Sequence, residues 1–298
     1  MLKKYRILLT NHALEEFRGS ETYCYTLAKE LSLSNNVFVY SPRPGMVAEK
    51  MKEFAEILKE PSGDYDIILF NHNNTIHEAF NAKCKIYTIH GIFPVLEKPP
   101  TGMDLYVAIS QEIANHYKSI NPVVIYNGID TEKYKPNNKN TKSKSNLLYS
   151  SNAKGNFSLI LYLASKSLGL NYRRIGRKKS KRTNVIEDIA WSDIVVGLGR
   201  TALEGLSSNK KVIIADKRFY NKVGMDGLLT AENVENIKKF NYSGRALRKV
   251  ITFFSLRNEI RKAINDDSTW EREWIMANHD IQKIADEYIS LAEQIMTK

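Results

Sequence analysis

The sequence predicts an α/β protein with two domains, each containing a parallel sheet covered by helices. Short apolar runs alternate with segments of helical period, and this alternation occurs twice along the chain. The apolar runs are continuous, which is typical of parallel strands that are buried on both faces. A chain of 298 residues is long for one domain and of ordinary length for two.

The first alternation covers residues 1–132. After its first strand, Ser20 is expected to cap a helix that runs to Leu33, because serine is a preferred N-cap residue. A second helix is expected over 75–82, and Ser110 is expected to cap a third. The strands predicted in this half are 6–10, 37–40, 65–70, 85–90, 105–109 and 123–126.

Residues 133–145 separate the two halves and are predicted to be a linker. They are polar and basic and have no hydrophobic period. In the second half, residues 146–298, the predicted strands are 147–150, 172–175, 194–197 and 212–215. The predicted helices are 157–168, one that begins with 201–207, 245–264, and one or two over 270–296.

The composition is that of a globular protein with a substantial core, since 43% of the residues are hydrophobic and 26% are charged. No apolar run approaches the roughly 20 residues that span a bilayer, and the first residues lack the pattern of a signal peptide. We therefore expect a cytoplasmic protein. Cys24 and Cys84 are too few for a disulfide framework or a zinc cluster, and the histidines lack the spacing of metal ligands.

The net charge of +11 is compatible with several kinds of partner. A basic surface attracts nucleic acid, anionic lipid headgroups or anionic substrates. It is equally compatible with a solvated, lysine-rich surface that binds nothing. The lysines are spread along the chain and do not cluster with aromatic residues, which argues against nucleic acid.

One strand–turn–helix segment of the second half has the strongest chemical signal. An apolar strand leads into a turn with Gly197 and Gly199 and then directly into a helix. Glycine permits positive φ and close approach of the backbone, and a helix N-terminus suits a phosphate. Arg200 could add a bidentate phosphate contact, and Glu204 could accept hydrogen bonds from vicinal hydroxyls such as those of ribose. The alternative is an ordinary segment in which Thr201 caps the helix and Glu204 is solvated.

The residues from Glu204 to 216 resemble the second half of the nucleotide-sugar motif of the retaining glycosyltransferases of family 4. The resemblance implies the GT-B fold, in which two Rossmann-like domains have parallel sheets that face each other across a cleft. It also implies that Glu204 binds the nucleotide ribose. By the same resemblance, Gly199, Arg200 and Thr201 line the diphosphate.

The chain departs from the family pattern at two places. The family has a first Glu, associated with the donor sugar, where this chain has Val196, so the sugar contact is unassigned. The segment 150–155 is similar to the family's Gly-Arg…Lys-Gly loop, which implies that Lys154 contacts the diphosphate. The arginine of that loop is missing, and Arg177 is a candidate substitute. These departures keep open a non-catalytic or degenerate relative that binds a sugar nucleotide or a glycan.

Further similarities lie outside this motif. Residues 127–130 (Asn-Gly-Ile-Asp) are similar to the segment that ends the family's N-terminal domain, and 18–21 resembles its glycine-rich loop. The second resemblance implies that Gly19 faces the donor phosphates. His90 ends a predicted strand like the family's strand-terminal His-Gly, which implies a catalytic contact with the transferred sugar or its leaving group. The segment 270–288 is similar to the family's C-terminal region, whose last helix packs back on the N-terminal domain.

The resemblance implies transfer of a sugar from a UDP-, GDP- or similar nucleotide sugar to a hydroxyl acceptor with retention of configuration. Residues 1–132 would then form the acceptor domain and 146–298 the donor domain. We expect no metal and no other cofactor, because Lys154, Arg200 and the helix N-terminus near Thr201 could neutralise the diphosphate. The Asp-Tyr-Asp sequence at 64–66 superficially looks like a metal motif but is interpreted as the polar start of a strand.

The acceptor is expected to be a glycan, a lipid-linked molecule or another hydroxyl compound. A basic, partly amphipathic segment over 243–264 could contact an anionic membrane, but packing of its apolar stripe into the second domain is the favoured interpretation. Two further classes are weighed besides a binding relative. One is a basic nucleic-acid-binding protein, which is not expected, and the other is a GT-B-type sugar-nucleotide epimerase.

Overall fold

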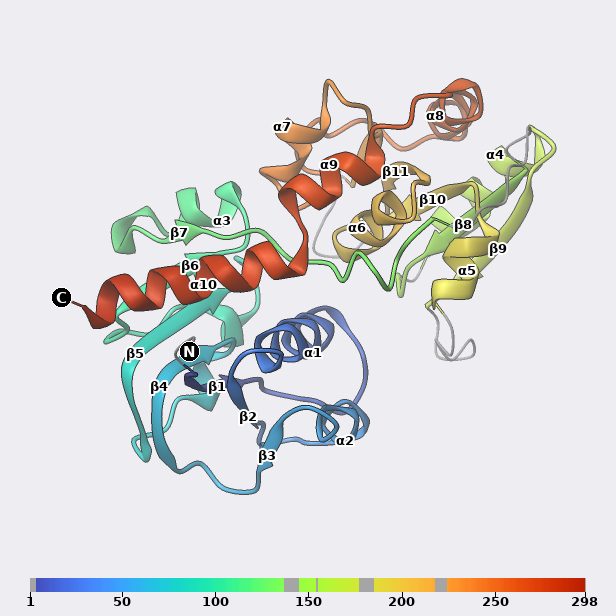
Figure 1. Ribbon diagram of the computed structural model, residues 1–298. Coiled ribbons are helices and arrows are strands. Elements are labelled where there is room, and N and C mark those ends of the chain that lie inside the picture. Colours follow the sequence, from blue (N-terminus) through green and yellow to red (C-terminus); the bar gives the residue numbers. More distant parts are fainter. Residues whose placement is uncertain (1–3, 137–144, 154, 177–184, 218–223, 298) are drawn as a thin grey trace. The chain divides into compact units, whose positions relative to one another are not determined.

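The computed structural model describes residues 4–136, 145–153, 155–176, 185–217 and 224–297. The chain forms two compact units (Figure 1). Unit 1 comprises Met1–Gly128 and His279–Lys298, and unit 2 comprises Ile129–Asn278. The chain therefore leaves unit 1 once and returns to it for its last helix.

Unit 1 contains a seven-stranded sheet with the order β3-β2-β1-β4-β5-β6-β7, and all neighbouring strands are parallel. The strands are β1 (Arg6–Thr10), β2 (Asn36–Tyr40), β3 (Glu56–Leu58), β4 (Gly63–Phe70), β5 (Phe80–Ile89), β6 (Leu105–Ala108) and β7 (Val123–Val124). The helices are α1 (Gly19–Ser32), α2 (Met46–Met51), α3 (Gln111–His116) and α10 (Ile281–Met296), with 3₁₀ turns η1 (Asn73–Thr75), η2 (Val95–Glu97) and η3 (Lys118–Ile120). The order reverses between β1 and β4, which makes their carboxyl ends a topological switch point.

Helices cover both faces of this sheet. On one face, strand residues such as Ile7 and Ile67 pack against α1, α2 and α10. On the other face, residues such as Ile68 pack against α3. The last helix is bonded to this unit through Tyr288, whose hydroxyl accepts a hydrogen bond from Tyr23 at 2.7 Å.

Unit 2 contains a five-stranded sheet with the order β12-β11-β10-β8-β9, in which only β12 is antiparallel to its neighbour. The strands are β8 (Asn146–Ser150), β9 (Asn171–Ile175), β10 (Ile194–Gly197), β11 (Lys211–Ala215) and β12 (Met225–Leu228). The helices are α4 (Phe157–Lys166), α5 (Val185–Trp191), α6 (Arg200–Ser207), α7 (Val234–Lys238), α8 (Phe253–Asn265) and α9 (Glu271–Asn278). Here the order reverses between β8 and β10.

Alternate residues of these strands face two helical layers. Leu148, Val195 and their neighbours pack against α5, α6 and α9. Leu147, Ile194 and their neighbours pack against α4 and α8 on the opposite face. Both units are thus α/β sandwiches of the predicted class. Within the described ranges, no helix is long and apolar enough to cross a membrane.

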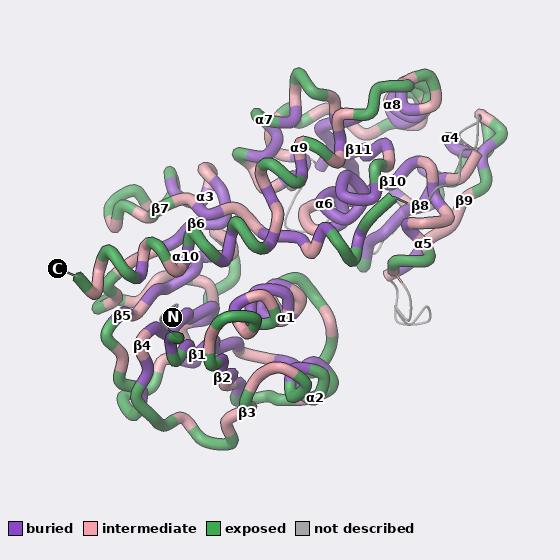
Figure 2. The backbone as a smooth tube through the Cα atoms, in the orientation of Figure 1, coloured by how far each residue is buried: buried purple, intermediate pink, exposed green. Residues whose placement is uncertain are grey.

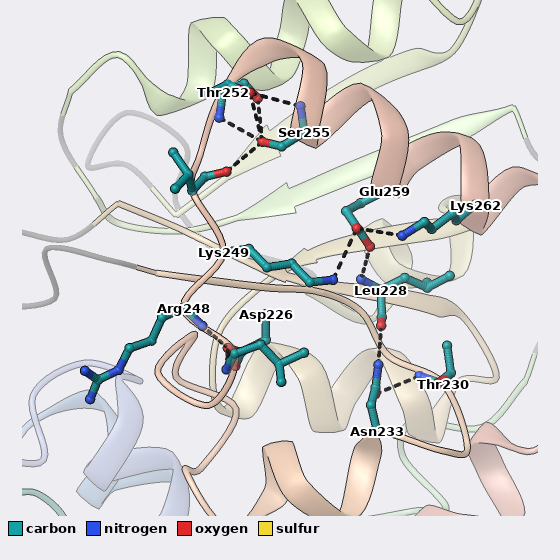
Figure 3. Close-up of polar contacts among 12 residues, drawn as sticks. Asp226, Leu228, Thr230, Asn233, Arg248, Lys249, Thr252, Ser255, Glu259 and Lys262 are labelled. Atoms are coloured by element: carbon teal, nitrogen blue, oxygen red, sulfur yellow. Dashed lines mark hydrogen bonds and ion pairs between the residues drawn. The ribbon is translucent and has the colours of Figure 1, made fainter.

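Two predicted helices are wrong. Residues 75–82 do not form a helix, because the chain from Phe80 onward pairs with β4 as the first part of β5. The helix predicted over 245–264 begins only at Phe253. Before it, Arg248 has a positive φ of 51°, and the buried Asp226 carboxylate accepts a hydrogen bond from the Leu247 backbone N–H at 2.7 Å (Figure 3). This conformation is incompatible with a regular helix.

The predicted caps have different outcomes. Ser110 caps α3, since its hydroxyl accepts a hydrogen bond from the Ile113 N–H at 3.3 Å. Ser20 does not cap α1, because the helix already begins at Gly19 and its N-cap residue is Arg18. The Ser20 hydroxyl instead donates to the Glu21 carboxylate at 3.2 Å.

The observed division of the chain differs from the predicted boundaries. Unit 2 begins at Ile129 and not after residue 132, because Ile129 and Tyr134 are buried in its core. The last residues, from His279, belong to unit 1. Most of the predicted linker, at 137–144, lies outside the described residues.

Candidate functional site

The strongest predicted site lies at the switch point of the unit 2 sheet. Segments that follow β8 and β10 meet where the strand order reverses, which is where open α/β sheets bind ligands. The turn after β10 approaches the end of β8 closely. A Cβ added to Gly197 would lie only 3.1 Å from the Ser150 carbonyl oxygen and 2.6 Å from the Thr201 Cγ2. Glycine is therefore required for this turn, as the sequence predicted.

Gly199 is the N-cap residue of α6 and has φ 56° and ψ −121°, a conformation that favours glycine. Its N–H donates to the Tyr242 carbonyl oxygen at 3.0 Å. A Cβ at this position would meet only the Asn241 carbonyl oxygen within 4 Å, at 3.8 Å. The start of α6 is thus held by a distant loop, whose Asn241 carbonyl oxygen lies in ordinary contact distance of such a Cβ.

Glu204 lies one turn into α6, which is buried over most of its length (Figure 2). One carboxylate oxygen, Oε1, accepts a hydrogen bond from the Tyr134 hydroxyl at 3.3 Å and lies 3.4 Å from the Arg200 Nε. The other oxygen, Oε2, is buried, and no described residue donates to it. A buried carboxylate oxygen without a donor is costly unless a ligand or water satisfies it. This geometry suits hydroxyl donors, and it excludes the solvated Glu204 of the alternative interpretation.

Thr201 and Asp216 connect the surrounding loops. The Thr201 hydroxyl donates to the Ser150 Oγ at 3.3 Å, so it joins α6 to the end of β8 and does not cap the helix. Asp216 follows β11 and is fully buried. Its carboxylate accepts hydrogen bonds from the Tyr149 hydroxyl at 2.7 Å and the Ser151 hydroxyl at 2.6 Å. Asp216 therefore fixes Ser151, the first residue after β8.

Three other residues that the sequence singled out in unit 2 have different outcomes. Val196 is fully buried and packs in the core between the sheet and α4 and α8. Lys154 and Arg177 lie outside the described residues. Their predicted contacts with a diphosphate therefore stay predictions.

The switch point of unit 1 holds three histidines that are far apart in the sequence. His12 follows β1, His72 follows β4, and His90 follows β5. The His72 and His90 rings stack with centroids 6.3 Å apart, and the His12 and His72 rings are 6.1 Å apart. The Tyr23 ring packs edge-on against His90 at 4.7 Å. The sequence predicted only His90, although the repeated Asn-His pair after β1 and β4 was a usable signal.

His90 is held in one neutral form. Asn71 donates through Nδ2 to the Thr10 carbonyl oxygen at 2.8 Å, so its Oδ1 faces the His90 Nε2 at 2.8 Å. This arrangement assigns the proton to Nε2 and leaves Nδ1 as an acceptor. Burial, together with His72, lowers the pKa of His90 to about 3, and burial lowers that of His72 to about 4. Neutral His90 is suited to accept a hydrogen bond and not to donate a proton as an acid.

Two more groups lie near this edge of unit 1. The Glu97 carboxylate packs on the backbone of Gly91, because a Cβ added there would meet its Oε2 at 2.3 Å. Burial raises the pKa of Glu97 to about 7. Gly19 begins α1, and a Cβ added to it would meet nothing within 4 Å. Local packing therefore does not require glycine at position 19.

No His, Cys, Asp or Glu side chains converge in groups of three or more that could hold a metal ion, as far as the described ranges show. Asp66, in the Asp-Tyr-Asp sequence, lies within β4 as interpreted from the sequence. Its carboxylate accepts a hydrogen bond from the Arg6 backbone N–H and pairs with Lys83 at 2.7 Å.

Comparisons with known proteins identify the fold. No protein-family profile and no curated protein matches the sequence. Among solved structures, the chain is similar to HepE of Anabaena in complex with UDP and glucose, with a TM-score of 0.64 and 14% identity over 97% of this chain and 99% of that one. It is similar to a glycosyltransferase from Rickettsia africae ESF-5, with a TM-score of 0.60 and 15% identity over 98% and 99%. A Listeria monocytogenes protein assigned as a UDP-N-acetylglucosamine 2-epimerase has a TM-score of 0.58 and 11% identity over 96% and 95%.

These likenesses span nearly the full length of both chains in each pair. They establish that the two Rossmann-like units form a GT-B fold, as predicted. At such low identity they establish the fold alone, because one fold supports several functions.

Proposed function

We propose that the chain is a glycosyltransferase that moves a sugar from a nucleotide diphosphate sugar to a hydroxyl acceptor. The observation that carries the proposal is the Glu204 carboxylate. One of its oxygens is held by Tyr134 and Arg200, and the other is buried with no donor among the described residues. It lies one turn beyond Gly199 at the start of α6. The vicinal hydroxyls of a ribose would supply the missing donor.

The donor diphosphate is proposed to lie at the start of α6. The partial positive charge of a helix N-terminus and the Arg200 guanidinium favour an anion there. Only the Asn241 carbonyl oxygen lies within 4 Å of a Cβ added to Gly199, so a phosphate could approach the backbone on this side. Lys154 and Arg177 are proposed as additional cations on the basis of the family resemblance. The structure of HepE with UDP and glucose is consistent with a nucleotide-sugar donor for this fold.

The transfer is proposed to proceed with retention and without a metal. The bond between the anomeric carbon and the phosphate oxygen breaks, and the acceptor oxygen bonds to that carbon on the same face. The acceptor proton passes to the departing diphosphate. Arg200 and the start of α6 stabilise the negative charge that develops on the leaving group. His90 accepts a hydrogen bond through Nδ1 from a hydroxyl of the transferred sugar.

A thermal-shift screen with UDP, GDP, ADP and their sugars tests the donor site. A nucleotide that binds only the folded protein raises its stability, by about 2.7 kcal/mol at a concentration 100 times the Kd. We expect selective stabilisation by one nucleotide and its sugars. If none of these ligands changes the melting temperature of the free protein, the proposal loses its basis.

Product analysis separates the enzyme from the two alternatives. With the bound donor and a panel of glycan and lipid-linked acceptors, NMR of the product should show the anomeric configuration of the donor. An epimerase, which the similarity to the Listeria protein makes a second candidate, would change the sugar of the donor without an acceptor. Binding without turnover of any donor would identify a non-catalytic relative, which the buried Val196 makes a third candidate.

A further inference from the structure

Large apolar side chains are exposed on α4, in the first turn of α8 and on the segment that leads into α8. Of the 13 exposed large apolar residues in the described part of the chain, three lie on α4, two on the segment that leads into α8, and one in the first turn of α8. We call them the α4–α8 patch: Leu159, Tyr162, Leu163, Leu247, Val250 and Phe254. Phe254 is 79% exposed and Val250 is 75% exposed. Scattered exposed apolar residues are ordinary, but a concentration of them marks an interaction surface.

The two helices of the patch belong to one layer. The inner sides of α4 and α8 pack on the same face of the sheet, through Leu161 and Ala164 and through Leu256 and Ile260. Arg257 of α8 also donates to the Ser167 Oγ just after α4 at 3.1 Å. The exposed residues of both helices lie opposite these buried ones, so they point outward from the same layer. The packing interpretation of the amphipathic segment is therefore right for its buried stripe, and the exposed residues are a separate set.

The charge of this layer is strongly positive. Residues 243–265 contain six basic side chains and one acidic one, Glu259, and α4 contains only Lys166 as a charged residue. Glu259 is buried and accepts hydrogen bonds from the Leu228 N–H, Lys249 and Lys262 (Figure 3). It presents no negative charge to an approaching surface. The exposed basic side chains include Lys166 of α4, Arg261 of α8, and Arg248, whose Nε donates to the Arg245 carbonyl oxygen at 3.1 Å.

The patch is held in a fixed conformation. Thr252 and Ser255 form a reciprocal capping box at the start of α8, and the Ser255 hydroxyl also donates to the Val250 carbonyl oxygen at 2.8 Å (Figure 3). Asp226 accepts hydrogen bonds from the backbone N–H groups of Leu247 and Arg248. The exposed side chains of this segment are thus presented by a bonded scaffold, so little conformational entropy is lost when they are buried by a partner.

We propose that the α4–α8 patch binds the surface of a membrane that contains anionic lipids. The apolar side chains would enter the region between headgroups and acyl chains, and the surrounding arginine and lysine side chains would contact lipid phosphates. The complementarity of charge selects this occupant. A purely apolar partner would not use the surrounding arginine and lysine side chains. Nucleic acid would leave the exposed leucines and valine without a partner. The proposal does not depend on glycosyl transfer.

Co-sedimentation of the full chain with vesicles tests the proposal directly. The probes are vesicles of phosphatidylcholine alone and of phosphatidylcholine mixed with phosphatidylglycerol. We expect binding to the mixed vesicles, weakened but not abolished by salt, because the apolar contacts are not screened. No binding to the mixed vesicles would overturn the proposal.

Matched variants locate the surface. Leu163→Ser and Phe254→Ser should each weaken binding about tenfold, because each removes the burial of one large apolar side chain. Arg261→Gln should weaken it several-fold and reduce its dependence on salt. Leu33→Ser, which changes a 74% exposed apolar residue of unit 1, and Lys118→Gln should bind like the parent. Equal binding by the patch variants and the parent would overturn the assignment.

Three further measurements distinguish a membrane from other occupants of the patch. A Phe254→Trp variant should show a blue-shifted emission with mixed vesicles and quenching by brominated lipid, which a structural defect would not produce. Sedimentation equilibrium without lipid should give a monomer. A dimer that Phe254→Ser dissociates would show that a second copy covers the patch. Binding to RNA that competes fully with vesicles and disappears in salt would show nucleic acid as the occupant.

Discussion

The carboxyl-terminal sheet edges of the two units have similar topology but different chemistry. In unit 2 the switch point holds two glycines and the paired charges of Arg200 and Glu204. In unit 1 it holds the neutral imidazoles of His72 and His90 and an amide, with His90 bonded to Asn71. All six histidines of the chain belong to unit 1, and all three tryptophans belong to unit 2. A common α/β scaffold thus presents an ionic edge in one unit and a neutral, hydrogen-bonding edge in the other.

This difference indicates which chemical groups of the proposed substrates each unit is suited to bind. An anionic nucleotide is favoured by a cationic side chain and by a helix N-terminus, and the unit 2 edge has Arg200 and the start of α6. A neutral sugar needs uncharged acceptors and aromatic surface, which the unit 1 edge has. The distribution of aromatic residues also makes the comparison measurable, because tryptophan fluorescence reports on unit 2 alone.

The largest expected effect tests the ionic edge. Glu204→Gln keeps the shape of the side chain but removes the charge that pairs with Arg200. Nucleotide affinity should fall by about 10- to 100-fold, since a hydrogen bond to a charged group contributes about 1.5–3 kcal/mol. Isothermal titration with the selected nucleotide measures this loss. Glu273→Gln, at an exposed carboxylate of α9, is the control and should bind normally.

The next largest effect is expected from a comparison of Gly→Ala substitutions at two helix starts. Gly199→Ala should destabilise unit 2 by about 1–3 kcal/mol, because alanine is strained at φ 56° and ψ −121°. Gly19→Ala should change stability by less than about 0.5 kcal/mol, since its Cβ meets nothing within 4 Å. Denaturant unfolding followed by tryptophan fluorescence measures the first, and hydrogen exchange of α1 measures the second. Equal stability of Gly199→Ala and the parent would show that the turn after β10 has another conformation.

A smaller effect should distinguish the two units through the pH dependence of their stability. The pKa of His90 is about 3 and that of His72 about 4 in the folded protein, below the value of about 6.5 in the unfolded chain. Folding therefore excludes protons from these rings, and unit 1 should lose stability as the pH falls below about 6.5. Unit 2 has no histidine and should lack this contribution.

The variant His90→Asn isolates the effect. It should be less stable than the parent at pH 7.5, and the difference should narrow toward pH 5. Comparing variant with parent also removes the opposite contribution of Glu97, whose raised pKa makes the folded state bind a proton more readily. Hydrogen exchange in β5 at a series of pH values gives the measurement. A constant difference would show that His90 titrates normally.

The smallest effect concerns the start of α8. Thr252→Ala removes one half of the capping box, in which the Thr252 Oγ1 accepts a hydrogen bond from the Ser255 N–H at 3.0 Å. Loss of such a cap costs about 1 kcal/mol. The fluorescence midpoint of unit 2 should fall accordingly, while Ser110→Ala, which removes the cap of α3, should leave it unchanged.

Much of the parallel-sheet framework could be predicted because its strands are continuous apolar runs. The turn from β10 into α6 was equally clear, since Gly197 and Gly199 have positions that only glycine occupies without strain. The antiparallel β12 was missed because it is short and contains Gly227. The helix expected over 75–82 failed because pairing with β4 outweighed local helical preference.

The candidate site was predicted only in part, for a physical reason. Residues near Glu204 in sequence were found, but Tyr134 lay in the predicted linker and Asp216 was seen only as the end of a motif. His12 and His72 are brought beside His90 by the order of the strands, which local patterns do not reveal. The cytoplasmic location and the roles of Lys154 and Arg177 stay predictions.

The chain path has a consequence for how the protein is made. Unit 2 is a continuous stretch, whereas unit 1 is completed only by α10. During synthesis, unit 2 emerges whole while unit 1 still lacks the helix whose Tyr288 bonds to Tyr23 and Thr88. The ribosome therefore delivers unit 2 ready to fold before unit 1, and α10 then covers one face of a sheet whose strands were all translated before unit 2.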